Sequence, residues 1–385
     1  MTLVQQFDDF LESTVNLNPH RIAKLDERLA AITTFLHDHP TFADLFRDVT
    51  PQGSYAHRTI IKPVGSGEYD ADVLLLLDEH PTWTPAEYTA ERCRAFRSSE
   101  RYKTMAHKRS RCVCIDYAGD FHVDVVPYVE DRWSITNNKG GLNGEGAWQL
   151  AYPERFTEWL EGKYRLTNDH LPEVIRLLKY LRDYKKTFSI KSVILSIMVG
   201  NVATEARAAD PSYYPDVPTT FVRVLEDLAD YVSLYEQMPL LLDPAGSGQD
   251  FRDRWDQDQY ANFRTRIQGY AAKARAALDV DGDISLGLWQ DIFGSDFKAP
   301  ASAVVASAAP SPPEQSLASL GISEKLTEQV RLVGRVRKVG VQRAYDLPSR
   351  GDRVAKSRTI DFRIANCTVT GPFDVYWKVK NYGDE

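Results

Sequence analysis

The segment from Glu68 to Leu77, with the sequence EYDADVLLLL, constrains this chain more than any other. Its apolar half is too hydrophobic for a surface loop and predicts a buried β-strand. Since successive side chains of a strand alternate between its faces, Asp70 and Asp72 lie on the same side, close together. Two neighbouring carboxylates repel each other, and burying them without a compensating charge is unfavourable. Mg²⁺ relieves this conflict, because it is typically held by one or two carboxylates plus substrate phosphates. The segment therefore predicts a metal site for phosphoryl transfer.

Two neighbouring segments carry the rest of such a site. Upstream, Gly53 and Ser54 allow the backbone to approach a phosphate closely and offer amide and hydroxyl donors. Downstream, residues 121–127 alternate as a strand that contains Asp124, and residues 112–117 precede it across a turn, as in a β-hairpin. If Asp124 pairs beside the first two aspartates, three carboxylates converge, which is enough to hold two metal ions.

Together these segments resemble the nucleotidyltransferase superfamily, and most of all the bacterial cGAS/DncV-like synthases of cyclic oligonucleotides. In that group the pattern runs Gln-Gly-Ser-Tyr, a Thr a few residues on, Glu-Tyr-Asp-x-Asp, and later Asp-Val-Val-Pro. This chain has QGSY from Gln52, then Thr59, EYDAD from Glu68 and DVVP from Asp124. It departs from the pattern in a Gly-Ser-Gly loop at 65–67. The resemblance implies an α+β fold, with a polymerase-beta-like sheet lobe and a helical lobe that closes the nucleotide cleft.

The resemblance also assigns roles to individual residues. It implies that two Mg²⁺ or Mn²⁺ ions are held by the catalytic residues Asp70, Asp72 and Asp124. It implies contacts with the nucleotide from a larger set, in which Lys179 lies on a helix and Ser192 begins the next one: Gln52, Gly53, Ser54, Thr59, Lys179 and Ser192. We expect the Lys179 ammonium on the triphosphate and not in the core. Ser192 is alternatively an ordinary N-cap.

Other polar residues near these motifs have simpler interpretations. Arg176 and Lys186 flank the buried face of their predicted helix, and we predict a solvated charged surface for both. His57 and His122 are expected to serve packing or polar networks, since metal activation makes a histidine base unnecessary. For Cys112 and Cys114 we favour core packing over zinc binding, because no Cys/His pair at zinc-finger spacing accompanies them.

Length and composition fit this interpretation. A chain of 385 residues with 43% hydrophobic content can bury a large core in two or three structural units. Its formal net charge of −7 argues against a general nucleic-acid binder, so no template is expected. Its 4 cysteines are too few for a disulfide scaffold. The sequence shows no membrane span and no signal peptide, which predicts a cytoplasmic protein.

The chain is predicted to contain four parts. They are a catalytic lobe with an N-terminal helix (1–165), a helical lobe (166–299), a flexible linker (300–317) and a β-rich segment (318–385). Apolar periodicity predicts helices over 20–39, 84–102, 171–186, 190–206, 219–234, 257–278 and 284–297. It predicts strands over 46–50, 333–339, 358–369 and 373–380. The last segment resembles the beginning of a C-terminal sensor domain that we expect to be incomplete, where a regulatory protein or ligand would bind.

These observations predict a metal-dependent enzyme that makes a cyclic di- or trinucleotide from NTPs, as a second messenger in bacterial antiphage (CBASS) signalling. A separate downstream effector would bind the product. The alternative is an adenylyltransferase that modifies a small molecule or a protein with the same carboxylates. A nucleotide-binding sensor without catalysis is disfavoured, because all three carboxylates are present.

Overall fold

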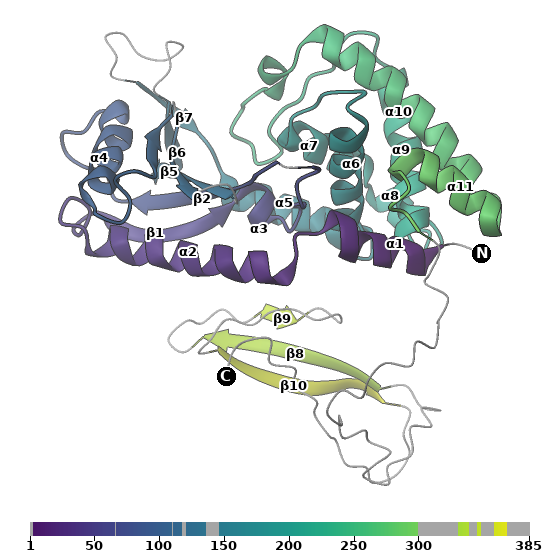
Figure 1. Ribbon diagram of the computed structural model, residues 1–385, viewed down its shortest axis with the longest axis horizontal. Coiled ribbons are helices and arrows are strands. Elements are labelled where there is room, and N and C mark those ends of the chain that lie inside the picture. Colours follow the sequence, from purple (N-terminus) through teal and green to yellow (C-terminus); the bar gives the residue numbers. More distant parts are fainter. Residues whose placement is uncertain are drawn as a thin grey trace. The chain divides into compact units, whose positions relative to one another are not determined.

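The computed structural model describes residues 3–65, 67–109, 111–117, 121–135 and 146–298, with only the backbone at 134–135. It also describes the backbone of three later strands, over 330–338, 345–347 and 358–367. The chain forms two compact units, Met1–Val304 and Val305–Glu385 (Figure 1). The predicted linker at 300–317 and the predicted strand at 373–380 lie outside the described residues.

The first unit contains a seven-stranded mixed sheet. Five of its strands lie in the order β1-β2-β5-β4-β3, and β6 and β7 continue from β5. β2 and β5 are parallel, whereas the other paired strands are antiparallel. The predicted hairpin is confirmed by the antiparallel pairing of β4 with β5. The strands are β1 (Phe46–Gln52), β2 (Tyr69–Leu77), β3 (Ala106–Lys108), β4 (Val113–Tyr117), β5 (Phe121–Val129), β6 (Arg132–Ile135) and β7 (Ala147–Leu150).

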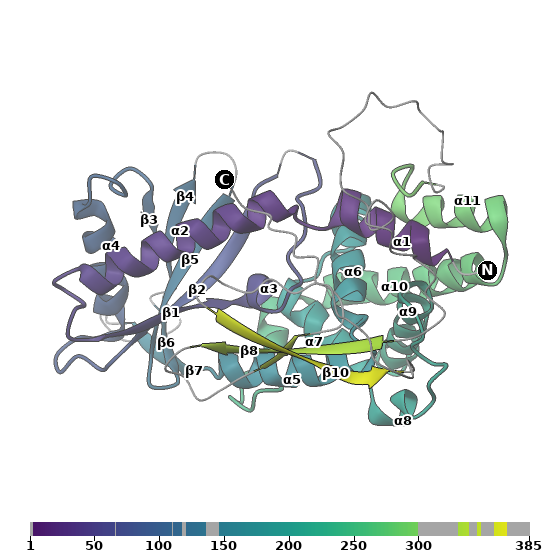
Figure 2. The same cartoon turned by 90° about the horizontal axis from the view of Figure 1, so that it is seen from below.

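Two predicted helices pack on the apolar side chains of this sheet. They are α2 (Pro19–Asp38) and α4 (Pro85–Ser98), and Figure 2 shows α2 running across the strands. Capping residues explain where each helix begins: the Asn18 side chain accepts a hydrogen bond from the backbone N–H of Arg21 in α2, and a capping box precedes α4. Ala71 and Val73 of β2 share a core with α2. Because side chains alternate along a strand, the aspartates of β2 lie on the opposite face.

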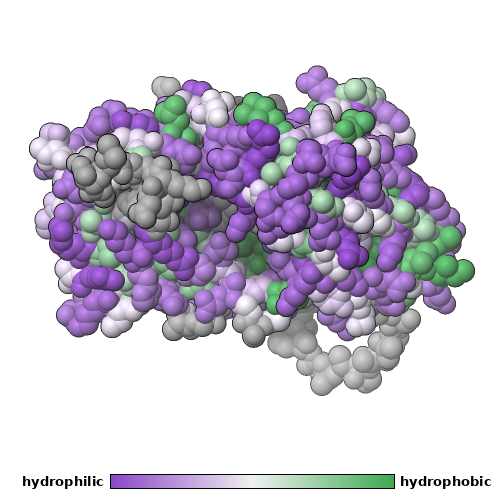
Figure 3. All heavy atoms as spheres, turned by 90° about the horizontal axis from the view of Figure 1, so that it is seen from above, coloured by the Kyte–Doolittle hydropathy of each residue, from purple (hydrophilic) through white to green (hydrophobic). Residues whose placement is uncertain are grey.

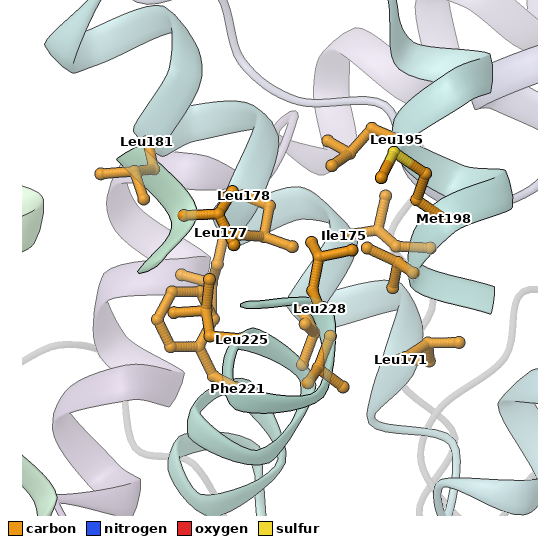
Figure 4. Packing of buried hydrophobic residues seen from close by; sticks show 14 of the residues in the cluster. Leu171, Ile175, Leu177, Leu178, Leu181, Leu195, Met198, Phe221, Leu225 and Leu228 are labelled. Carbon is orange, nitrogen blue, oxygen red and sulfur yellow. The ribbon is translucent and has the colours of Figure 1, made fainter. Parts of the chain in front are cut away.

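Helices make up the rest of the first unit, around a second core. Figure 4 shows this core, where leucines of α6 meet Phe221 and Leu225 of α9 and Met198 of α7. The predicted helices are confirmed, with boundaries shifted by up to four residues, and α5 and α8 were not predicted. The helices are α5 (Pro153–Leu166), α6 (Leu171–Lys185), α7 (Ser192–Val202), α8 (Glu205–Ala208), α9 (Val217–Ser233), the 3₁₀ turn η3 (Phe251–Arg254), α10 (Gln257–Leu278) and α11 (Gly282–Phe293).

The N-terminal helix α1 (Val4–Phe10) and the π-helical turn η1 (Leu11–Val15) also pack into this second core. The Phe7 ring lies 4.8 Å from that of Trp289, edge to face. Helix α5 also packs into the second core, through Leu160 and Tyr164. Residues before 165 thus contribute to both cores, and a boundary at residue 165 separates side chains that pack together.

The second unit contains a three-stranded antiparallel sheet in the order β10-β8-β9. Its strands are β8 (Val330–Lys338), β9 (Tyr345–Leu347) and β10 (Arg358–Cys367). β8 and β10 confirm the strands predicted at 333–339 and 358–369.

Among the described residues, the helices are too short or too polar to cross a membrane. Hydrophilic residues cover most of the face in Figure 3, with apolar residues in small separate groups.

Candidate active site

The sheet register brings the three predicted aspartates onto neighbouring strands. Asp72 of β2 lies directly opposite Asp124 of β5, and Asp70 lies opposite His122. Directly paired residues of adjacent strands share a face. The three carboxylates therefore lie on the face turned away from the α2 core, in the pairing expected from the sequence.

A tight turn places the Gly-Ser motif against this row. Gln52, the last residue of β1, pairs with Asp72, and the short helix α3 (Gly53–Ala56) begins immediately after it. Gly53 has a φ of +63°, and a Cβ atom added there would lie 2.8 Å from Oδ2 of Asp72. Glycine is required for both reasons, since it accepts positive φ and leaves room for the carboxylate. Ser54 follows it, half-buried.

The environment of Asp72 disfavours the negative charge of its carboxylate. Burial, with the charges of Asp70 and Asp124, raises the pKa of Asp72 to about 7. Oδ1 of Asp124 is buried and has no hydrogen-bond partner among the described residues. The other oxygen of Asp124 lies 3.5 Å from Nη1 of Arg109. The row therefore has more negative charge than nearby side chains neutralise, and a bound cation would relieve it.

Three side chains from helices α5 and α6 hold the loop that follows α3. The hydroxyl of Tyr164 donates to the carbonyl of His57 at 2.8 Å, and Nη1 of Arg176 donates to that of Arg58 at 2.6 Å. Nζ of Lys179 donates to the carbonyl of Thr59 at 2.8 Å. Arg58 has a φ of +58°, a left-handed conformation that is unfavourable for a side chain with a Cβ. We call these consecutive hydrogen bonds to residues 57–59 the loop clamp.

The loop clamp changes the expected roles of Lys179 and Thr59. Both are buried, with 3% and 1% of their surface exposed, and Nζ of Lys179 also lies 3.1 Å from the Thr59 hydroxyl. The prediction that the ammonium lies outside the core is therefore wrong. Burial lowers the pKa of Lys179 to about 7, with a further effect from the charge of Arg182. These residues position the loop beside α3, and direct contact of either with a nucleotide remains a prediction.

Ser192 begins α7, and its hydroxyl accepts a hydrogen bond from Nη1 of Arg182 at 3.2 Å. It lines an open polar cavity of about 600 Å³ with three cationic side chains, Arg182, Lys186 and Lys191. Ser192 is the first residue inside the helix, and the N-cap position is held by Lys191. Asp183, which pairs with Arg182 at 2.7 Å, also lines this cavity, and contact of Ser192 with a nucleotide remains a prediction.

The other residues weighed in the sequence have mixed outcomes. His57 stacks on Phe156 at 5.2 Å and lies 3.2 Å from the Thr157 hydroxyl, which is the predicted packing role. Burial, with the charge of Lys179, lowers the pKa of His57 to about 4. Lys186 is exposed, as predicted. The prediction of a solvated face for Arg176 is wrong, because only 14% of its side chain is exposed and it belongs to the loop clamp.

Arg92 is a buried charged residue that none of the sequence motifs identified. It is fully buried on α4, and all of its guanidinium nitrogens lack hydrogen-bond partners among the described residues. Burial lowers its pKa to about 9, against the opposing effect of charges that include Asp124. The helical spacing indicates this burial. Tyr88 and Phe96 lie four residues on either side of Arg92, so all three residues share one face of the helix.

Two known domain families match this chain, one in each of its two units. Residues 1–163 match the Second Messenger Oligonucleotide or Dinucleotide Synthetase (SMODS) domain. Residues 314–385 match the Adenylyl/Guanylyl and SMODS C-terminal sensor domain, AGS_C.

Two curated proteins are similar over much of the chain. A c-di-GMP synthase from Roseivirga ehrenbergii is 24% identical over 278 residues, which are 64% of this chain and 71% of that protein. A cyclic AMP-AMP-AMP synthase from Acinetobacter sp. is 26% identical over 323 residues, which are 78% of this chain and 87% of that protein.

Among solved structures, CdnC of E. coli bound to ATP has a TM-score of 0.58 at 18% identity, covering 77% of this chain and 99% of that one. The same protein has been solved in a complex with HORMA-deltaN. This likeness confirms the predicted α+β fold.

Proposed function

We propose that this chain, which belongs to the cGAS/DncV-like nucleotidyltransferases, joins NTPs into a cyclic di- or trinucleotide without a nucleic-acid template. The observation that carries this proposal is the pairing of Asp72 with Asp124, beside Asp70 and against Gly53. The similarity to synthases of cyclic di- and trinucleotides supports the same class of product.

A hard divalent cation fits the aspartate row. Carboxylate oxygens are the ligands that Mg²⁺ and Mn²⁺ prefer. The raised pKa of Asp72 and the unpartnered Oδ1 of Asp124 both indicate that the row lacks a positive charge. We propose that Asp70, Asp72 and Asp124 hold two Mg²⁺ or Mn²⁺ ions. When bound, such ions activate the attacking hydroxyl and neutralise the pyrophosphate that leaves.

The chain's own residues then bind and orient the nucleotides. We propose that the backbone of Gly53 and the hydroxyl of Ser54 hold the donor phosphates, with Gln52 beside them at the end of β1. The loop clamp keeps this turn at a constant position relative to the helical lobe, which is what an in-line displacement requires. Ser192 would bind a phosphate oxygen at the edge of its cationic cavity.

The experiment that tests the proposal is incubation of the purified chain with each labelled NTP and with NTP mixtures, in Mg²⁺ or Mn²⁺, followed by phosphatase. We expect labelled products whose mass phosphatase leaves unchanged, because a cyclic oligonucleotide has no terminal phosphate to lose. Products that all lose phosphate under this treatment would overturn the cyclase proposal. Label that appears only when a small-molecule or protein acceptor is added would support the adenylyltransferase alternative.

We further propose a regulated role in antiphage defence. The AGS_C match at 314–385 supports a sensor function, so a ligand or protein that binds there would control synthesis. The complex of CdnC with HORMA-deltaN is one precedent for a protein partner in this fold. The test is expression of the chain with its neighbouring genes in bacteria, where wild type should protect against phage and Asp72→Asn should not. Equal protection by both would contradict this role.

A further inference from the structure

Three potential metal ligands of different chemistry meet beside the aspartate row. They are Cys114 of β4 and His122 and Asp124 of β5, and their ligand atoms all lie within 4.8 Å of one another. The register explains the meeting, because Cys114 lies directly opposite Asp124. His122 precedes Asp124 by two residues and therefore shares its face. The cluster arises from strand pairing and not from a sequence motif, so the missing zinc-finger spacing does not argue against it.

Cys114 belongs to the polar face of the sheet. Its neighbours Val113 and Ile115 are part of the apolar core on the other face, and Cys114 is not. It is nevertheless shielded from solvent, with 2% of its surface exposed. The buried Oδ1 of Asp124, without a hydrogen-bond partner among the described residues, is a second observation that points to a ligand here.

We propose that Cys114, His122 and Asp124 form a second metal site, which takes a borderline cation such as Zn²⁺ and not Mg²⁺. Thiolate and imidazole ligands suit Zn²⁺, whereas Mg²⁺ is bound by oxygen. Three protein ligands leave one position of a tetrahedral site for water. Binding converts the Cys114 thiol to the thiolate, and its proton is released to water.

Two neighbouring side chains lie close to the ligands of this site. An oxygen of Glu68 lies 3.9 Å from Nδ1 of His122, where it can orient the imidazole ring. Arg109, 3.5 Å from Asp124, has to move away when a cation binds. The Arg109 side chain is 50% exposed and that of Asp124 is 15% exposed, so the guanidinium can turn into solvent when a cation takes its place.

The second site shares Asp124 with the cations of the proposed reaction. A Zn²⁺ ion in the second site therefore withdraws one carboxylate from the aspartate row. We expect Zn²⁺ to inhibit synthesis in the presence of Mg²⁺. This consequence rests on the proposed function, whereas the binding of Zn²⁺ itself does not.

The test of binding is a titration of the full-length chain, without a histidine tag, with Co²⁺ under absorption spectroscopy. We expect a thiolate-to-cobalt charge-transfer band that added Zn²⁺ removes by displacement. Cys114→Ser should abolish the band, and His122→Asn should weaken Co²⁺ affinity by about tenfold or more. Cys93→Ser removes another buried thiol, on α4, and should leave the band unchanged.

A wild-type chain without the band, or a band that persists in Cys114→Ser, would overturn the proposal. Thermal denaturation without metal identifies a variant that has failed to fold, and His122→Asn, at a half-buried position, then decides the outcome. The activity measurement is separate. A chain that binds Co²⁺ through Cys114 but makes no product refutes the proposed function and leaves the second site intact. If the chain makes product and binds Zn²⁺ but is not inhibited by it, the claim that the two sites share Asp124 is wrong.

Discussion

Nζ of Lys179 lies 2.8 Å from the carbonyl oxygen of Thr59 and 3.1 Å from its hydroxyl oxygen, although the two residues are 120 positions apart. This contact joins α6 of the helical lobe to the loop that follows the Gly-Ser turn of the sheet lobe. With Tyr164 and Arg176 it holds three consecutive carbonyl groups. The position of the proposed phosphate-binding turn therefore depends on side chains of α5 and α6.

Lys179→Met should destabilise the fold, because it leaves the buried carbonyl and hydroxyl of Thr59 without their donor. We expect a loss of about 1–3 kcal/mol in the free energy of unfolding, measured by urea denaturation. Lys186→Met, at an exposed position just after the same helix, should have almost no effect. An unchanged unfolding free energy together with lost ATP affinity would instead favour a direct contact between Lys179 and the triphosphate.

Gly53→Ala tests the close approach of the turn to Asp72. The new Cβ would be 2.8 Å from a carboxylate oxygen, and the backbone would keep a positive φ. Gly246→Ala is the matched control, since Gly246 also has a positive φ but no atom within 4 Å of the added Cβ. Both variants should lose about 1 kcal/mol from backbone strain. Only Gly53→Ala should lose more stability and also product formation, so equal behaviour of the two in both measurements would contradict the proposed geometry.

Asp72→Asn should reduce product formation to below about a hundredth of the wild-type rate, since it removes a shared cation ligand without changing volume. Without divalent cations its melting temperature should equal or exceed that of the wild type, because the repulsion from Asp70 and Asp124 is gone. Asp44→Asn, at an exposed position in the same lobe, should alter neither property. A variant that is inactive because it unfolds would not support the assigned role.

His57 should make stability depend on pH between about 4 and 6.5. Its pKa is lowered to about 4 in the folded chain from an ordinary value of 6.5, so the unfolded chain binds more protons in this window. Stability contributed by neutral His57 is present above pH 6.5 and is lost as the pH falls toward 4. The loss at the low end is on the order of 3 kcal/mol.

The measurement is the free energy of unfolding at several pH values in this window, for wild type and His57→Gln. The variant should show a weaker pH dependence, although it is less stable at neutral pH because it loses the stacking on Phe156. His20→Gln, at an exposed position, should retain the wild-type slope. If His57→Gln also retains that slope, His57 is not the titrating group.

Local sequence patterns determined most of the secondary structure and the face on which the carboxylates lie. The alternation around Asp70 and Asp72, and the hairpin that carries Asp124, predicted the strands and the shared face of the carboxylates. Apolar residues at helical spacing predicted most of the helices. These features depend on residues close together in the chain, because the periods of helices and strands are local properties of the backbone.

Tertiary structure alone decided which distant polar groups meet. The burial of Lys179 and Arg176, their hydrogen bonds to residues 58 and 59, and the meeting of Cys114 with His122 depend on which helices and strands pack together. In the sequence, a lysine that ends in a buried hydrogen bond looks the same as one that ends in solvent. Only the packing of the two lobes supplies the oxygen partners that offset part of the cost of burying the ammonium.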